Sequence, residues 1–218
     1  MEQLCTLRAR HAAEKAHAGD VAARTVQAED VAVRERIVFT AGNSLTIETC
    51  VVRNLSSGVV FAPSGSSRLA VSSTVVANNG TNGIIVAPEG SGVVTAALDR
   101  VEAYHQGLDG IIISGTAATG GSITAVATNS VAAGNVIGFN VLGGVPTILT
   151  VVNSVSANNG IGLHASGLST LRLAGSTLID NPTHGWQIDN GALIETFGDN
   201  NIRGNGANTG PLTPISKQ

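Results

Sequence analysis

Residues 147–165, TILTVVNSVSANNGIGLHA, contain the pattern that indicates the fold of this chain. The stretch holds two short apolar runs rich in Val and Ile, an Asn-Asn-Gly turn, and a further apolar run after the glycine. β-Branched residues favour strands because they fit a pleated surface, and Asn and Gly are typical of tight turns. Similar stretches precede and follow this one, so we interpret it as one coil of a repeat protein.

The repeat becomes visible when the second apolar run of each unit is aligned. The aligned positions are 23 to 30 residues apart and are Val51, Val75, Val101, Val131, Val155, Leu178 and Ile202. A glycine opens the third run of each unit, at Gly58, Gly83, Gly110, Gly138, Gly162 and Gly185, with Gly210 in the matching place of the last unit. Seven units in register predict a solenoid in which each coil packs on its neighbours.

Each unit has room for three short strands and no helix. Side chains alternate between the two sides of a strand, and the third runs have apolar residues flanking a variable middle residue. We therefore expect the flanks to point inward and the middle residues to point to solvent; these are Val60, Ile85, Ile112, Asn140, His164 and Gln187. The pattern predicts an all-β fold, a right-handed parallel β-helix of about seven coils over residues 37–210. A leucine-rich-repeat horseshoe has a similar period but needs the LxxLxLxxN signature.

The two ends of the chain differ from the repeats. Residues 1–36 are Ala-rich and carry 12 of the charged residues, which predicts a short helical segment that is either a cap or poorly ordered. An uncapped stack of strands invites aggregation, so we expect part of this segment to fold over the coil near Leu45. Residues 211–218 form a polar tail with two prolines, which we expect to end strand addition.

Composition limits the possible functions. Apolar residues make up 43% of the 218 residues, aromatic residues 3% and charged residues 12%, which predicts an aliphatic core. The net charge of −3 comes with no basic patch, so nucleic acid is not an expected partner. No run approaches the roughly 18 apolar residues of a membrane span, and the first 20 residues lack the apolar stretch of a secretory signal. The two cysteines, Cys5 and Cys50, are expected to be free thiols.

Three units and the last coil carry a family resemblance. SLTIETCVVRNLSSGVVFAP (44–63), RLAVSSTVVANNGTNGIIVAP (68–88) and TLRLAGSTLIDNPTHGWQI (170–188) resemble coils of bacterial right-handed parallel β-helix repeat proteins of the pectin-lyase-like group. The ending ETFGDNNIRGNG (195–206) resembles the final coil of an uncharacterised set within that group. The resemblance implies the fold and a secreted or cell-envelope location. Since members of that set usually carry a signal peptide and further N-terminal coils, it also implies that this chain is N-terminally truncated or has a misassigned start.

The polar residues predict structure more strongly than chemistry. Asn tolerates turn conformations and can bond along a stack, so we interpret one column as a structural ladder: Asn54, Asn78, Asn158, Asn181 and Asn205. The histidines His105, His164 and His184 occupy different columns, and no metal or cofactor is expected.

Enzymes of the resembled group carry NTD, DD, GHG or RIK motifs or clustered calcium-binding carboxylates, none of which occurs here. Glycoside hydrolysis needs two carboxyl groups about 5 to 9.5 Å apart. The pairs that the spacing allows are Asp99 with Glu102, and Asp180 with Asp189 or Asp199.

Our functional hypothesis rests on the middle residues of the third apolar run of each coil. They are apolar in the first coils (Val60, Ile85, Ile112) and polar in the later ones (Asn140, His164, Gln187). An exposed apolar stripe marks a contact surface, so we expect it to be covered or to mediate self-association. We expect a non-catalytic surface or envelope protein whose rod recognises polysaccharide. A lyase or glycosidase with an unrecognised site is the alternative, and a gene fragment without its own function is the third.

Overall fold

The computed structural model describes residues 6–10 and 37–216. These residues form strands and no helix. The strands are β1 (Thr6–Arg10), β2 (Ile37–Phe39), β3 (Ser44–Glu48), β4 (Val51–Arg53), β5 (Val59–Phe61), β6 (Ser67–Ala77), β7 (Ile84–Val86), β8 (Val93–Tyr104), β9 (Asp109–Ser114), β10 (Ser122–Thr128), β11 (Val131–Ala133), β12 (Ile137–Val152), β13 (Val155–Ala157), β14 (Ile161–Ala174), β15 (Thr177–Ile179), β16 (His184–Asp189), β17 (Leu193–Thr196), β18 (Asn201–Arg203) and β19 (Thr213–Pro214).

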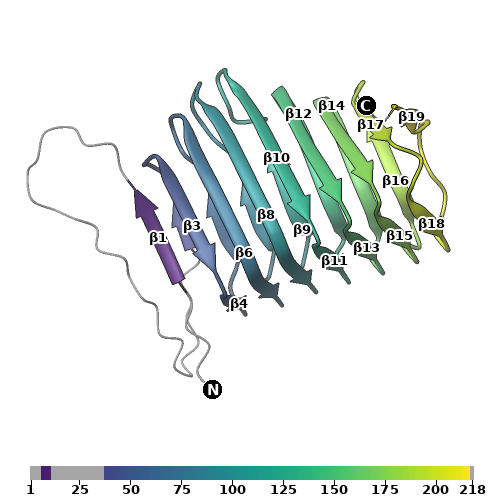
Figure 1. Ribbon diagram of the computed structural model, residues 1–218, viewed down its shortest axis with the longest axis horizontal. Helices are drawn as coiled ribbons and strands as arrows, with labels where there is room; N and C mark the ends of the chain where they lie inside the picture. Colours follow the sequence, from purple (N-terminus) through teal and green to yellow (C-terminus); the bar gives the residue numbers. More distant parts are fainter. Residues whose placement is uncertain (1–5, 11–36, 217–218) are drawn as a thin grey trace, which may run out of the picture.

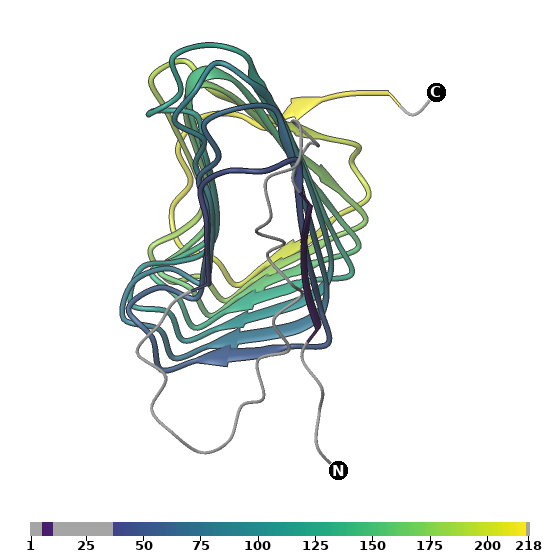
Figure 2. The same cartoon turned by 90° about the vertical axis from the view of Figure 1, so that its left-hand side faces the viewer.

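The strands from β2 onward pair in parallel with the equivalent strands of neighbouring coils, which builds a rod (Figure 1). The rod has three faces around one core (Figure 2). Face A consists of β3, the first parts of β6 and β8, β10, the second parts of β12 and β14, and β17. Face B consists of β4, the second parts of β6 and β8, β11, β13, β15 and β18. Face C consists of β2, β5, β7, β9, the first parts of β12 and β14, and β16. The predicted parallel β-solenoid of about seven coils is confirmed.

The core between the faces is aliphatic. Fully buried side chains come from every face, for example Leu98 and Leu149 from face A, Val76 from face B and Ile111 from face C. Burying one such side chain stabilises the fold by about 1.5 to 3 kcal/mol. The core is long and continuous, so each coil depends on the coils on both sides of it.

The glycine that opens the third run has no room for a side chain. A Cβ on Gly83 would lie 2.5 Å from the carbonyl oxygen of Gly110 in the next coil, and a Cβ on Gly162 would lie 2.6 Å from that of Gly185. Neighbouring strands are about 4.8 Å apart, so the glycine column lets successive coils approach at this bend.

Polar ladders form at two corners of the coil. Between faces A and B, Thr74, Ser130, Ser154, Ser176 and Asn200 each accept a hydrogen bond from the backbone amide of the preceding coil. Between faces B and C, the acceptors are Asn79, Gln106, Asn135, Asn159, Asn181 and Asn205. These side chains satisfy corner amides that no sheet partner reaches.

The Asn ladder differs from the predicted one by one residue in several coils. Asn181 and Asn205 are in it, whereas Asn54, Asn78 and Asn158 precede it and adopt the left-handed conformation, with φ of 61°, 54° and 53°. The difference arises from our alignment. The structure places Glu102, Thr177 and Asn201 in register with Val51, Val75, Val131 and Val155, so coil lengths are 24, 27, 29, 24, 22 and 24 residues. Val101, Leu178 and Ile202 belong to neighbouring columns.

Both ends of the rod carry covering segments. β1 pairs antiparallel with β3, with Ala9 opposite Leu45, which is where we expected the cap. Thr6–Arg10 form a strand there instead of the expected helix, and the rest of the 1–36 segment lies outside the described residues. At the other end β19 pairs with β17, so the tail adds one short strand. Trp186 also binds the chain that follows β18, through Asn208, Thr209 and Gly210.

Two further expectations can be compared with the structure. Cys50 is disulfide-bonded, and no described cysteine is free, so the expectation of free thiols is wrong. Among the described residues there is no helix long and apolar enough to cross a membrane.

Candidate functional site

The outward residues of face C form one continuous column along the rod. The register aligns Val60, Ile85, Ile112, Asn140, His164 and Gln187 in that order. The three apolar residues are half-buried, and Val38 extends them towards the N-terminal end with 47% of its surface exposed. The column therefore has an apolar half and a polar half, as the sequence predicted.

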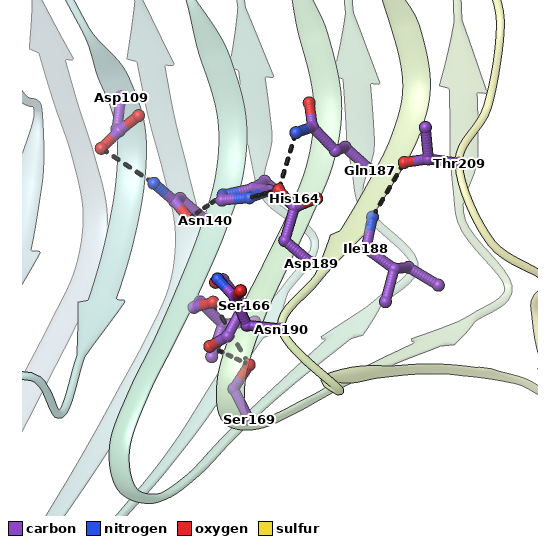
Figure 3. A network of polar contacts seen from close by, with 11 residues as sticks. Asp109, Asn140, His164, Ser166, Ser169, Gln187, Ile188, Asp189, Asn190 and Thr209 are labelled. Carbon is purple, nitrogen blue, oxygen red and sulfur yellow. Dashed lines mark hydrogen bonds and ion pairs between the residues drawn. The ribbon is translucent and has the colours of Figure 1, made fainter.

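Two carboxylates join the polar half and make a hydrogen-bonded chain (Figure 3). Asn140 Nδ2 donates to Asp109 Oδ2 over 3.2 Å, and Asn140 Oδ1 lies 2.9 Å from His164 Nδ1. His164 Nε2 lies 3.0 Å from Asp189 Oδ2, which also accepts a 2.7 Å bond from Gln187 Nε2. We call Asp109, Asn140, His164, Gln187 and Asp189 the polar row.

The polar row fixes the orientation of the His164 imidazole. Asn140 must present its oxygen to His164, because its amide nitrogen donates to the Asp109 carboxylate. The other ring nitrogen faces Asp189, which is also an acceptor. Both ring nitrogens of His164 therefore face oxygen atoms, which fixes the plane of the imidazole between Asn140 and Asp189.

Exposure increases along the row. Asn140 is 4% exposed and Asp109 is 7% exposed, whereas the side chains of His164 and Asp189 are 14% and 40% exposed. We expected Asn140 to point to solvent, and this expectation is wrong because Asp109 and His164 hold both atoms of its amide. The row therefore has a buried end that fixes the orientation of His164 and an open end formed by Gln187 and Asp189.

The two carboxylates have pKa values shifted in opposite directions. Burial raises the pKa of Asp109, and the hydrogen bond from Asn140 and the charge of His164 offset this only in part. Hydrogen bonds from His164 and Gln187 lower the pKa of Asp189. The open end of the row is thus held anionic more firmly than the buried end.

Neighbouring polar contacts hold the open end in place (Figure 3). Asn190, directly after Asp189, donates to Ser166 Oγ over 2.9 Å, and Ser169 Oγ donates to the carbonyl oxygen of Ser166 over 3.0 Å. The amide of Ile188 donates to Thr209 Oγ1 over 3.1 Å. The strand that carries Gln187 and Asp189 is therefore fixed on one side by β14 and on the other by the C-terminal segment.

The carboxylate pairs expected from spacing are engaged elsewhere. Asp99 accepts hydrogen bonds from Thr128 and Asn129 and forms an ion pair with Arg100. Glu102 lies on face B, and the pKa of Tyr104 is raised there by burial and by the charge of Glu102. Of the other two expected acids, Asp180 adopts a left-handed conformation at a corner, and Asp199 accepts a bond from the Gly175 amide. Within the described residues no group of three or more His, Cys, Asp or Glu side chains is placed to hold a metal.

Sequence reasoning found three members of the polar row and missed two. Asp189 follows Gln187 by two residues, so strand alternation alone places both on the same side of β16. Asp109 directly precedes the glycine of its coil, where no other unit has a carboxylate, and only the structure shows that Asn140 of the next coil reaches it.

A shallow depression lies on face A, away from the polar row. Polar and small side chains line it, namely Asn43, Ser44, Ser66, Ser67, Arg68, Val93 and Thr95. It contains no carboxylate or histidine and none of the residues that the sequence singled out.

Comparison with known proteins yields no family model, no curated protein and no solved structure that matches this chain significantly. The fold therefore rests on the strand register, and the polar row is interpreted from its own geometry.

Proposed function

We propose that this protein is a non-catalytic rod that binds a polysaccharide along face C, as a surface or cell-envelope protein. The observation that carries the proposal is the continuous column in which Val60, Ile85 and Ile112 run into the polar row. A sugar ring has an apolar side formed by C–H groups and a rim of hydroxyl groups. The column offers both kinds of surface in a line, with one residue about every 4.8 Å.

The polar half supplies both donors and acceptors for hydroxyl groups. Carboxylates accept, and the Gln187 amide has a second N–H besides the one directed at Asp189. Because His164, Gln187 and Asp189 are already held by one another, binding orders few side chains, which reduces the entropic cost.

The disulfide at Cys50 supports a location outside the reducing cytoplasm. This agrees with the envelope location implied by the family resemblance. Whole-cell fractionation, followed by trapping of free thiols in each fraction, tests it. Protein found in the cytoplasmic fraction with reduced thiols would contradict the location.

Binding is tested with a panel of neutral, acidic and amino polysaccharides, using the intact chain and variants of the column. Ile85→Lys places a charge in the apolar half, and His164→Ala interrupts the polar row. We expect both to weaken binding at least about fivefold, because each removes an interaction of roughly 1 kcal/mol. Thr124→Ala on the exposed part of face A is the matched control. Binding that both column variants retain at full strength would refute the proposal.

Glycan cleavage is a second candidate function, favoured by one observation. The pKa of Asp109 is raised and that of Asp189 is lowered, as for an acid and its ionised partner. Asn140 and His164 lie between the two carboxyl groups, which are therefore farther apart than hydrolysis of one glycosidic bond by the pair requires. The appearance of new reducing ends in the same samples, and its loss in Asp109→Asn, would favour cleavage. Binding without new ends would favour recognition.

A further inference from the structure

The charges around face C indicate which class of glycan fits it; this inference rests on the proposed function. Face C and the turns that flank it contain no Arg or Lys in residues 37–216. The arginines that the structure describes in this range lie on face A, on face B or at the corner between these two faces, and are Arg53, Arg68, Arg100, Arg172 and Arg203. The imidazoles of His105, His164 and His184 are the only basic side chains in the same part of the chain that lie on or beside face C.

Acidic groups, by contrast, lie on this face and beside it. Asp109 and Asp189 belong to the polar row, while Glu89 follows β7 and Asp180 lies in the turn before β16. An anionic polymer such as a polyuronate would bring its carboxylates against these groups with no guanidinium or ammonium to receive them. Like charges at contact distance oppose binding, so the face disfavours acidic polysaccharides.

The polar row has acceptor atoms that the protein leaves unused. Asp189 receives both of its hydrogen bonds on Oδ2, and no described residue donates to its Oδ1. Asp109 is only 7% exposed. Among the described residues its carboxylate accepts one hydrogen bond, from Asn140 on Oδ2. An ionised carboxylate oxygen prefers a charged donor, since charge-assisted hydrogen bonds are the stronger ones.

We propose that the polar row binds a glycan with free amino groups, whose ammonium donates to the open oxygen of Asp189. Gln187 and His164 position that carboxylate, and neighbouring hydroxyl groups of the sugar bond to the Gln187 amide. The same face rejects polyuronates.

The test compares three probes at mildly acidic pH, where the sugar amine is protonated. They are an oligomer of glucosamine, an oligomer of N-acetylglucosamine of equal length, and polygalacturonate with either calcium or a chelator. We expect glucosamine to bind at least about fivefold more tightly than its acetylated form, the scale of one partly exposed ion pair. Polygalacturonate should not bind in either condition.

Two variants locate the preference. Asp189→Asn keeps the side-chain shape but removes the charge, so it should abolish the preference for glucosamine. Glu102→Gln removes one charge from face B and should leave the preference intact. Equal affinity for the two oligomers, or a preference that survives in Asp189→Asn, would overturn the inference. So would binding of polygalacturonate that depends on His164. If none of the three probes binds, and no neutral glycan binds either, the proposed function itself fails.

Discussion

Replacing Asn159 by Ala should cost far more stability than replacing Asn158, its neighbour in the sequence. Asn159 is completely buried, and its side chain makes five hydrogen bonds: two from Asn135, and one each to the Ala132 carbonyl, Ser156 Oγ and Asn181 Oδ1. The substitution removes all five and leaves the backbone amide of Asn135 buried without an acceptor.

The magnitude follows from these contacts. A hydrogen bond contributes about 1 kcal/mol net, and a buried group left without a partner costs about 1 to 3 kcal/mol. Some groups keep a second partner, since Asn135 Nδ2 also donates to Ala103 and Asn181 Oδ1 also accepts from the Asn159 amide. We therefore expect Asn159→Ala to lower the free energy of unfolding by about 4 kcal/mol.

Asn158→Ala is the matched control. Asn158 is exposed, with a φ of 53°, and its side chain makes no ladder bond. Its replacement should cost only the strain of a left-handed alanine, about 1 kcal/mol. Urea unfolding followed by circular dichroism measures both variants, with the slope checked for two-state behaviour. An equal loss in the two variants, or a larger loss in Asn158→Ala, would refute the ladder argument.

Three further predictions concern the bend, the polar row and the N-terminal cap. Gly162→Ala should destabilise the rod by about 3 kcal/mol in the same unfolding assay, because its Cβ meets the Gly185 carbonyl oxygen of the next coil as well as the side chains of Leu178 and Asn181; a much smaller loss would mean that the coils separate easily. Asp109→Asn should raise the unfolding midpoint at pH 7. The pKa of Asp109 is raised in the folded state, so the wild-type protein loses stability as the pH rises through the folded-state pKa, and the substitution removes this loss. Asp189→Asn should lower the midpoint at pH 7, because a lowered pKa stabilises the fold above the ordinary value of 3.8 and the benefit disappears as pH falls. Thermal melts from pH 3 to 7 measure both, and effects of the same sign would contradict the opposite shifts. Arg8→Pro with Ala9→Pro should detach β1 from β3 and convert monomer into larger species in light scattering, since proline cannot donate to a neighbouring strand; unchanged mass would show that β1 does not protect this edge.

The sequence was sufficient to predict the solenoid because its main signals are local. A glycine that admits no Cβ, a turn residue and alternating apolar residues recur in every coil, so the number of coils and the outward column of face C follow from simple alignment. His164 and Gln187 were placed correctly beside Asn140 for the same reason, since strand alternation and coil register act on every unit alike.

The errors arose where a polar residue replaces an apolar one. Glu102 occupies an outward position of face B that is valine in neighbouring coils, so matching by hydrophobicity selected the adjacent Val101. The burial of Asn140 was not predictable, because it depends on contacts with Asp109 and His164 in other coils. The strand at Thr6–Arg10 gave no signal either, since its pairing with β3 is made through backbone atoms.

The covering segments at the two ends have a consequence for how many coils can be joined. In the described part of the chain, β4 and β18 on face B each pair with a single neighbour, so both ends of that face keep open backbone groups. On face A, however, β1 and β19 project beyond the last coils. A second rod approaching end to end meets these two strands first, and they hold its face B about two strand spacings, or roughly 10 Å, away. Within the described residues the two ends of the rod are therefore stepped and not flat, so a second rod could not continue all three faces at the same strand spacing.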